Sequence, residues 1–301
     1  MTPRGGGLAR AAGFGAITLG FAVTDPLVLI ALPLVVLLIA HGPLRVRSAI
    51  LVGVLLAIAA LGDRVGLWWF EHGWPLLLGG AFVWVSAMRP RWSFSTRALT
   101  AVAAAALLAV GVFAISPAAW LDLDALMRSR ANQAASSMAT LLGPRVDEVR
   151  SLLTSLTRLQ AAIFPALLGV SSVGALGVAA AARSWLAGDP DGAFGRLRNF
   201  RFNDHLVWVW LIGLALLLSP AGEIAERVGG NAAVFMGALY VMRGLAVLLM
   251  LAGGIPWALG LIGAIVAILL APLLILLLLV ALFVGVGDTW LDVRRRVRDR
   301  A

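Results

Sequence analysis

Residues 255–287 read IPWALGLIGAIVAILLAPLLILLLLVALFVGVG, a run of 33 residues without a charged side chain. A single membrane-spanning helix needs about 20 apolar residues, so this run is too long for one crossing and barely long enough for two. Ala271-Pro272 lies at its middle, where a proline kinks or ends a helix. The run predicts a helical backbone that has lipid as part of its solvent.

The composition of the whole chain agrees with this prediction. Of the 301 residues, 61% are hydrophobic and 13% are charged, whereas a soluble domain is about half apolar and about a quarter charged. The 24 basic residues are all arginine and lie scattered between apolar segments, so no nucleic-acid partner is expected. With no cysteine and only three histidines, no metal site and no cofactor is expected.

The fold class expected is all-α, a polytopic bundle in the lipid bilayer. Nine hydrophobic segments follow one another, at residues 8–24, 26–40, 48–62, 74–88, 98–116, 161–182, 206–219, 232–251 and 255–287. Loop arginines mark the cytoplasmic side and place both termini there. Splitting the last segment then makes the number of crossings even, and we expect eight to ten crossings of a bacterial inner membrane.

Residues 117–160 are polar enough to leave the membrane. Their apolar positions recur at helical spacing on either side of Gly143-Pro144, which predicts two amphipathic helices on the outer face. The chain thus divides into an N-terminal transmembrane half (1–116), an amphipathic extracytoplasmic insert (117–160), a C-terminal transmembrane half (161–287) and a basic cytoplasmic tail (288–301).

Arg243 is the sharpest candidate for a site, because it falls near the middle of the segment 232–251. An arginine at such a depth costs about 2.5–3.5 kcal/mol on insertion scales and normally has a partner inside the protein. Met236, Tyr240 and Arg243 share one helical face. They are a binding site for an anionic or carboxylate-bearing ligand, or Arg243 forms a structural pair with an acid such as Glu71 or Asp288, or its side chain snorkels to the membrane interface.

Three further features have a structural and a functional interpretation. Small residues recur every fourth position in the first segment, at Ala12, Ala16 and Gly20; they serve internal packing or the docking of a partner protein. Glu71-His72 lies in an aromatic belt and is either an interfacial anchor or a proton relay. Asn203 and Asp204 precede an apolar segment, where helix capping explains both.

The end of the last segment is the most patterned stretch of the chain. Trp290 is predicted to lie at the membrane interface, and Asp288 and Asp292 to fall early in a new helical turn. Nowhere does the sequence contain G-x-x-x-x-G-K-[ST], H-E-x-x-H or G-x-S-x-G. We therefore expect that the chain is not an enzyme and that a transport role would need a separate source of energy.

Four places in the chain resemble the YybS-like family of bacterial polytopic membrane proteins. The closing signature G-x-x-D-x-[WF]-x-D-[FV]-R is matched by Gly285, Asp288, Trp290, Asp292 and Arg294. Residues 239–247 resemble the family's L-Y-x-x-Q-G-L-A-V segment, with Arg243 where the family usually has Gln. Phe164-Pro165-Ala166 and Phe200-Arg201-Phe202 match two further segments, although a proline usual near residue 202 is missing.

The resemblance implies a fold similar to the substrate-binding subunits of energy-coupling-factor transporters. Those subunits bind a small molecule and dock on a membrane coupling protein through small residues of their first helix. It would make Ala12, Ala16 and Gly20 the partner face, with Arg243, Tyr240 and Met236 binding a ligand that the sequence does not name. The alternative is a non-transporting membrane scaffold or envelope-associated interaction protein.

Overall fold

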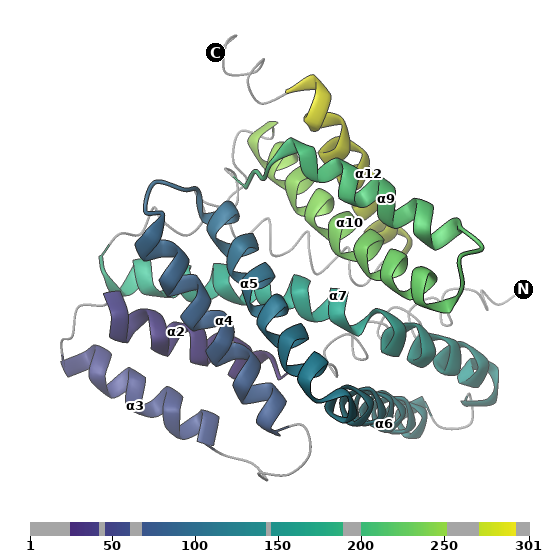
Figure 1. Ribbon diagram of the computed structural model, residues 1–301, viewed down its shortest axis with the longest axis horizontal. Helices are drawn as coiled ribbons and strands as arrows, with labels where there is room; N and C mark the ends of the chain where they lie inside the picture. The colour runs from purple at the N-terminus through teal and green to yellow at the C-terminus, as the bar shows by residue number, and fades with distance from the viewer. Residues whose placement is uncertain are drawn as a thin grey trace, which may run out of the picture. The chain divides into compact units, whose positions relative to one another are not determined.

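The computed structural model describes residues 25–41, 46–60, 68–142, 146–188, 200–251 and 271–292, and every regular element among them is a helix (Figure 1). The elements are α2 (Pro26–His41), α3 (Val46–Ala60), α4 (Trp68–Met88), α5 (Phe94–Ile115), α6 (Pro117–Leu142), α7 (Val146–Leu186), the 3₁₀ turn η3 (Asp204–Leu206), α9 (Val207–Leu218), α10 (Glu223–Leu251) and α12 (Ala271–Leu291). The predicted all-α fold is confirmed.

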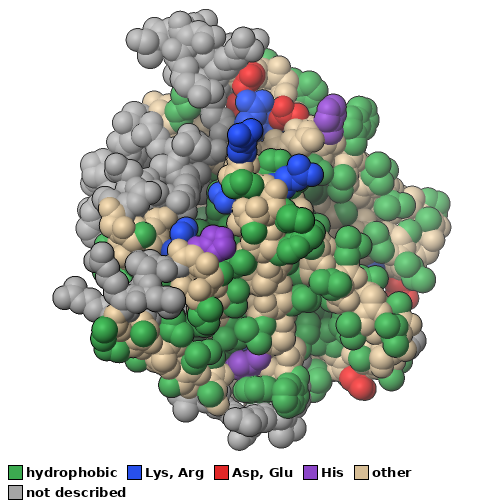
Figure 2. Space-filling view, turned by 60° about the vertical axis from the view of Figure 1, so that its left-hand side comes forward, with side chains coloured by type: hydrophobic (Ala, Val, Ile, Leu, Met, Phe, Trp, Pro, Cys, Tyr) green, Lys and Arg blue, Asp and Glu red, His purple; other side chains and the backbone are tan. Residues whose placement is uncertain are grey.

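Four of the described helices are long and apolar enough to cross a membrane: α5, residues Ser155–Leu186 of α7, α10, and residues Leu273–Leu291 of α12. Pro26–His41, Ala49–Ala60 and Asp204–Leu218 are shorter apolar helices. Large apolar side chains of α5 are exposed, Leu107 at 73% and Ile115 at 88%. Hydrophobic side chains also cover much of the face shown in Figure 2. The protein is a polytopic helical membrane protein, as predicted.

The predicted number of eight to ten crossings also depends on residues 8–24 and 255–270, which lie outside the described residues. The predicted break at Ala271-Pro272 falls at the edge of the described residues, which resume at residue 271 in α12. Gly143-Pro144 falls between α6 and α7, also outside the described residues.

The helix α7 joins two regions that the sequence analysis separated. It runs for 41 residues from Val146 to Leu186, so the second amphipathic helix of the insert and the span after it are one helix. The predicted boundary at residues 160/161 falls inside α7. The chain forms two compact units, which divide at 22/23, at 127/128 within α6, at 167/168 within α7 and at 202/203.

The α4 unit comprises residues 23–127 and 168–202. Its centre is α2, a helix apolar on all sides with nine buried residues, which packs against α3 and α4. The backbone of α4 comes close at Gly79, where a Cβ would lie 3.0 Å from the Cα of Pro33. Arg183 of α7 closes the end of α2 by donating to the carbonyl of His41 at 2.8 Å.

The α10 unit comprises residues 1–22, 128–167 and 203–301, and its described part contains a helical hairpin of α9 and α10. Gly222 makes the turn between them with a φ of +94°, a conformation that favours glycine. The two helices touch through their backbones, because a Cβ on Gly229 would lie 2.6 Å from the carbonyl oxygen of Gly213. Glu223 and Glu226 lie in the first turn of α10, where the positive end of the helix dipole stabilises their negative charges.

The closest approach in the α10 unit is between α10 and α12, which lie side by side in Figure 1. A Cβ on Gly244 would overlap the carbonyl oxygen of Ala281, and a Cβ on Gly285 would overlap that of Tyr240. Only glycine fits at both positions. The glycine that opens the closing signature of the sequence is therefore a packing residue.

A third helix is joined to α10 by one amide side chain. Pro165 lies inside α7, and a proline ring pushes away the carbonyls of the preceding turn. Asn231 of α10 enters the gap: it accepts from the backbone N–H of Ala166 at 3.0 Å and donates to the carbonyl of Ala162 at 2.9 Å. Its amide thus bonds to the donor and to the acceptor that pair with each other in a regular helix.

We expect Gly244→Ala to destabilise the protein by about 2 kcal/mol or more, because α10 and α12 must separate to admit the methyl group. The measurement is the free energy of unfolding in mixed micelles with increasing denaturing detergent. The control is Gly237→Ala in the same helix, where the nearest atom to a new Cβ is 3.8 Å away. Equal effects of the two substitutions would contradict the backbone contact.

A double-mutant cycle tests the amide in α7. Asn231→Ala should cost about 2 kcal/mol, because two backbone groups lose their partners. In a Pro165→Ala background the helix can form its own hydrogen bonds, so the same substitution should cost clearly less. Additive effects of the two substitutions on the free energy of unfolding would show that Asn231 does not repair the proline site.

Candidate functional site

Arg243 lies at the centre of a buried charge cluster in the α10 unit, and its side chain is 0% exposed. Its Nε donates to Oδ2 of Asp288 at 2.9 Å, and its Nη2 donates to the backbone carbonyl of Asp288 at 3.1 Å. Its Nη1 donates to Oδ1 of Asp204 at 2.6 Å. One guanidinium thus joins three elements: α10, the end of α12 and the 3₁₀ turn η3.

The two carboxylates of the cluster differ in their access to solvent. The Asp288 side chain is 0% exposed, whereas the Asp204 side chain is 38% exposed. Asp288 falls in the last turn of α12, where the helix dipole disfavours a negative charge. The positive charge of Arg243 offsets that cost, and the buried pair is electrically neutral.

This geometry corrects the prediction that Asp288 and Asp292 begin a new helical turn. The helix α12 continues to Leu291, so Asp288 lies before its end. Asp292 follows the helix with a φ of 41°, the left-handed conformation that often terminates a helix and that Asp tolerates better than most residues. Trp290 is 66% exposed on the last turn.

Tyr240 and Met236 complete the buried face of α10 that the sequence predicted, with side chains 0% and 3% exposed. The Tyr240 hydroxyl lies beside Thr289 of α12. Its ring is 5.7 Å from that of Trp210 on α9, measured between centroids. Tyr240 and Trp210 thus form an aromatic contact between α10 and α9.

The structure decides between the two acids considered as internal partners of Arg243: the ion pair is with Asp288, while Glu71 belongs to the α4 unit. Asp204 was missed. Helix capping explains Asn203, whose Oδ1 accepts from the backbone N–H of His205 at 3.0 Å, but it leaves out the ion pair of Asp204. The sequence shows only a carboxylate directly before an apolar segment, and that pattern does not distinguish a helix cap from an ion pair with a distant arginine.

The remaining predicted site residues are the partner-binding stripe and the closing signature. Ala12, Ala16, Gly20 and Arg294 lie outside the described residues. Of the closing signature, Gly285 makes the backbone contact with α10 and Asp288 binds Arg243. Two signature residues therefore have a structural explanation.

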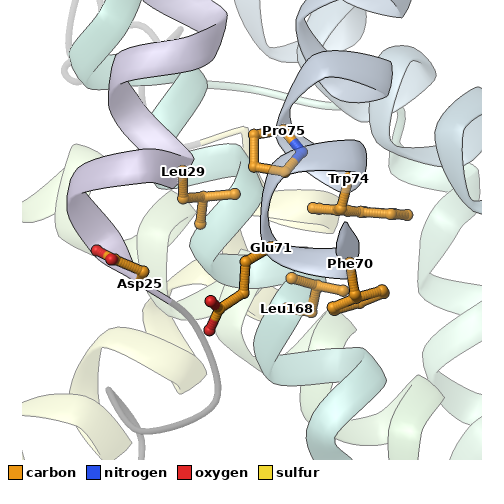
Figure 3. A pocket seen from close by; sticks show the side chains of 7 residues that line it. All are labelled: Asp25, Leu29, Phe70, Glu71, Trp74, Pro75 and Leu168. Carbon is orange, nitrogen blue, oxygen red and sulfur yellow. The ribbon is translucent and has the colours of Figure 1, made fainter. Parts of the chain in front are cut away.

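The α4 unit contains a separate small hollow, shown in Figure 3. It is lined by Asp25, Leu29, Phe70, Glu71, Trp74, Pro75 and Leu168. Asp25 accepts from the backbone N–H of Leu27 at 3.0 Å and caps α2, and Glu71 lies in the first turn of α4. The starts of two helices account for both acids.

His72 connects two helices of the α4 unit. One ring nitrogen lies 2.7 Å from the carbonyl of Trp68 in the preceding turn, and the other faces the carbonyl of Ala59 near the end of α3. The imidazole also stacks on the Trp68 ring, with centroids 4.1 Å apart. In this arrangement His72 satisfies a carbonyl at a helix end.

Comparison with known proteins identifies one family. A family described as "Predicted membrane protein (DUF2232)" matches residues 17–288 of the chain. No curated protein and no solved structure matches it.

The unequal burial of the two aspartates predicts unequal costs of neutralising them. Asp288→Asn should destabilise the protein by about 3–5 kcal/mol, because it removes the counter-charge on the buried side of Arg243. Asp204→Asn should cost clearly less, since the neutral Asp288–Arg243 pair remains. Detergent-induced unfolding measures both, and a larger cost for Asp204→Asn would contradict this assignment.

Proposed function

We infer that this chain, which belongs to the DUF2232 family of predicted membrane proteins, acts within a membrane. We propose that it is the small-molecule-binding membrane subunit of a bacterial inner-membrane transporter, and that a separate partner supplies the energy. No catalytic step is part of this proposal. Both termini are placed in the cytoplasm, because the arginine-rich ends of the chain follow the positive-inside rule.

The observation that carries the proposal is the position of Arg243 in a helix able to span a membrane. Ionisable groups at such depth are costly and mark ligand or ion pathways by default. One carboxylate bound to Arg243 is reached by solvent. Tyr240 and Met236 on the same face supply apolar surface beside the charge.

The proposed partner is a membrane coupling protein that docks on Ala12, Ala16 and Gly20. Such a stripe of small residues lets a second helix approach closely. The resemblance of residues 239–247 and 285–294 to the YybS-like family supports the same reading, since the implied fold belongs to subunits that bind a ligand and depend on a coupling protein.

The closed state of the Arg243 cluster favours a second candidate, a membrane scaffold or envelope-associated interaction protein. Both carboxylates are bound to the guanidinium, and α10 touches α12 through its backbone. A bundle sealed in this way suits a rigid platform. In that case Arg243 only holds the helices together.

Affinity purification in mild detergent, followed by mass spectrometry of proteins and small molecules, tests the proposal. We expect a co-purifying membrane coupling protein and a bound metabolite. Gly20→Leu should remove the coupling protein, because the larger side chain blocks close helix approach, while Thr18→Leu on another face should retain it. Recovery of envelope or membrane-assembly proteins alone, without a small molecule, would support the scaffold.

A further inference from the structure

In the described part of the α4 unit, acids and arginines lie at opposite ends of the helices. Asp25 and Glu71 lie at the starts of α2 and α4, beside Leu168 of α7. Further along α7, Arg183 donates to the carbonyl of His41, the last residue of α2. The unit thus has an acidic end, where α2 and α4 begin, and a basic end, where α2 and α7 end.

The connection between α4 and α5 belongs to the basic end, because α4 begins at the acidic one. The backbone N–H of Trp92 donates to the carbonyl of Arg89 at 3.2 Å, which closes a β-turn with Pro90 at the position that suits its fixed φ. Ser93 then caps α5 by accepting from the backbone N–H three residues further on, at 3.3 Å. Residues 89–93 therefore form a turn of defined shape.

Both arginines of this turn are available to a ligand. Arg89 and Arg91 are exposed, and within the residues that the structure describes neither forms an ion pair. The guanidinium carbon of Arg89 lies 5.4 Å from the centre of the Trp92 ring, a cation–π contact that restrains the side chain. Contact with the face of a ring leaves the N–H groups in the guanidinium plane able to bind oxygen atoms. The turn therefore presents two guanidinium groups whose donors no described carboxylate occupies.

The length of α5 places this turn at the surface of the membrane. The helix begins at Phe94, has 22 residues and is apolar enough to cross a bilayer. At about 1.5 Å per residue it is about 33 Å long, which matches a hydrocarbon core of about 30 Å. The residues directly before Phe94 therefore lie at the depth of the lipid headgroups, where a tryptophan such as Trp92 is favoured.

We propose that Arg89 and Arg91 bind the phosphate of an anionic phospholipid of the surrounding bilayer. A guanidinium pairs with phosphate oxygens through two parallel hydrogen bonds, and the negative charge of the headgroup is attracted to the basic end of the unit. This inference goes beyond the proposed function, because it requires neither a transported molecule nor a coupling protein. The bound lipid fixes this end of the α4 unit at one surface of the membrane.

Exposed apolar side chains at the end of α4 provide a surface for the acyl chains of the same lipid. Trp84 and Met88 are 61% and 62% exposed, and residues four apart share one face of a helix. Arg89 directly follows Met88, so this apolar face continues into the cationic turn. A lipid gains from both surfaces, whereas a soluble anion gains only from the arginines.

The test is lipid binding to the detergent-solubilised full chain, measured by native mass spectrometry during titration with dioleoylphosphatidylglycerol. Each basic side chain beside an anionic membrane surface contributes about fivefold to affinity, so R89Q/R91Q should raise the Kd of the first bound lipid about tenfold or more. Both side chains are exposed, so the melting temperature without added lipid should not change. If the double variant is unstable, Arg91→Gln alone takes its place, with an expected rise of about fivefold.

Three comparisons make the result specific. Arg158→Gln removes an exposed arginine of α7 that lies outside this turn, and it should leave the Kd unchanged. Dioleoylphosphatidylcholine has the same phosphate and acyl chains without the net charge, so it should bind more weakly and lose less affinity in R89Q/R91Q. Inorganic phosphate at matched ionic strength should not displace the bound phosphatidylglycerol.

Equal Kd values for the unaltered protein and R89Q/R91Q would overturn the proposal. An equal loss of affinity in Arg158→Gln would do the same, because it would show attraction by the overall charge of the chain. Displacement by inorganic phosphate would identify a soluble anion as the ligand in place of a lipid, and equal binding of the two lipids would contradict the requirement for an anionic headgroup.

Discussion

The structure of the α10 unit depends on one requirement: the charge of Arg243 has to be neutralised inside the protein. A guanidinium in lipid is expensive, so Arg243 needs a carboxylate within hydrogen-bond distance. Asp288 supplies it at 2.9 Å, which is only feasible if α12 lies against α10. The backbone contact at Gly244 and Gly285 provides that proximity. The need to neutralise Arg243 on α10 thus explains why glycines stand where α10 and α12 cross.

The same helix meets a second polar requirement, at Pro165 of α7. There the unsatisfied groups belong to the backbone, and the amide of Asn231 on α10 restores both hydrogen bonds. In each case a polar side chain of α10 compensates for something that lipid cannot solvate. The helix α10 is therefore the element on which α7, α9 and α12 converge within the unit, and its few polar residues determine where they attach.

The sequence predicted what depends on local composition and failed where partners are distant. Hydrophobic segments and the absence of charge within them predicted a helical membrane protein, and helical spacing predicted that Met236, Tyr240 and Arg243 share a buried face. Asp288 could only be offered as one of two possible partners, because 45 residues separate it from Arg243. Asp204 was explained by capping, which is a local effect, and its longer-range ion pair leaves no periodic pattern. The boundary between the insert and the following span was drawn at residues 160/161 from a change in polarity, whereas α7 runs through that point from Val146 to Leu186.

The order of the three charged residues along the chain also sets the order in which they are synthesised. A polypeptide is made and inserted from its N-terminus, so Asp204 leaves the ribosome 39 residues ahead of Arg243, and Asp288 follows 45 residues behind it. Asp204 is therefore available to Arg243 before Asp288 follows. The half-exposed carboxylate of Asp204 can therefore neutralise the guanidinium during synthesis, until Asp288 pairs with it.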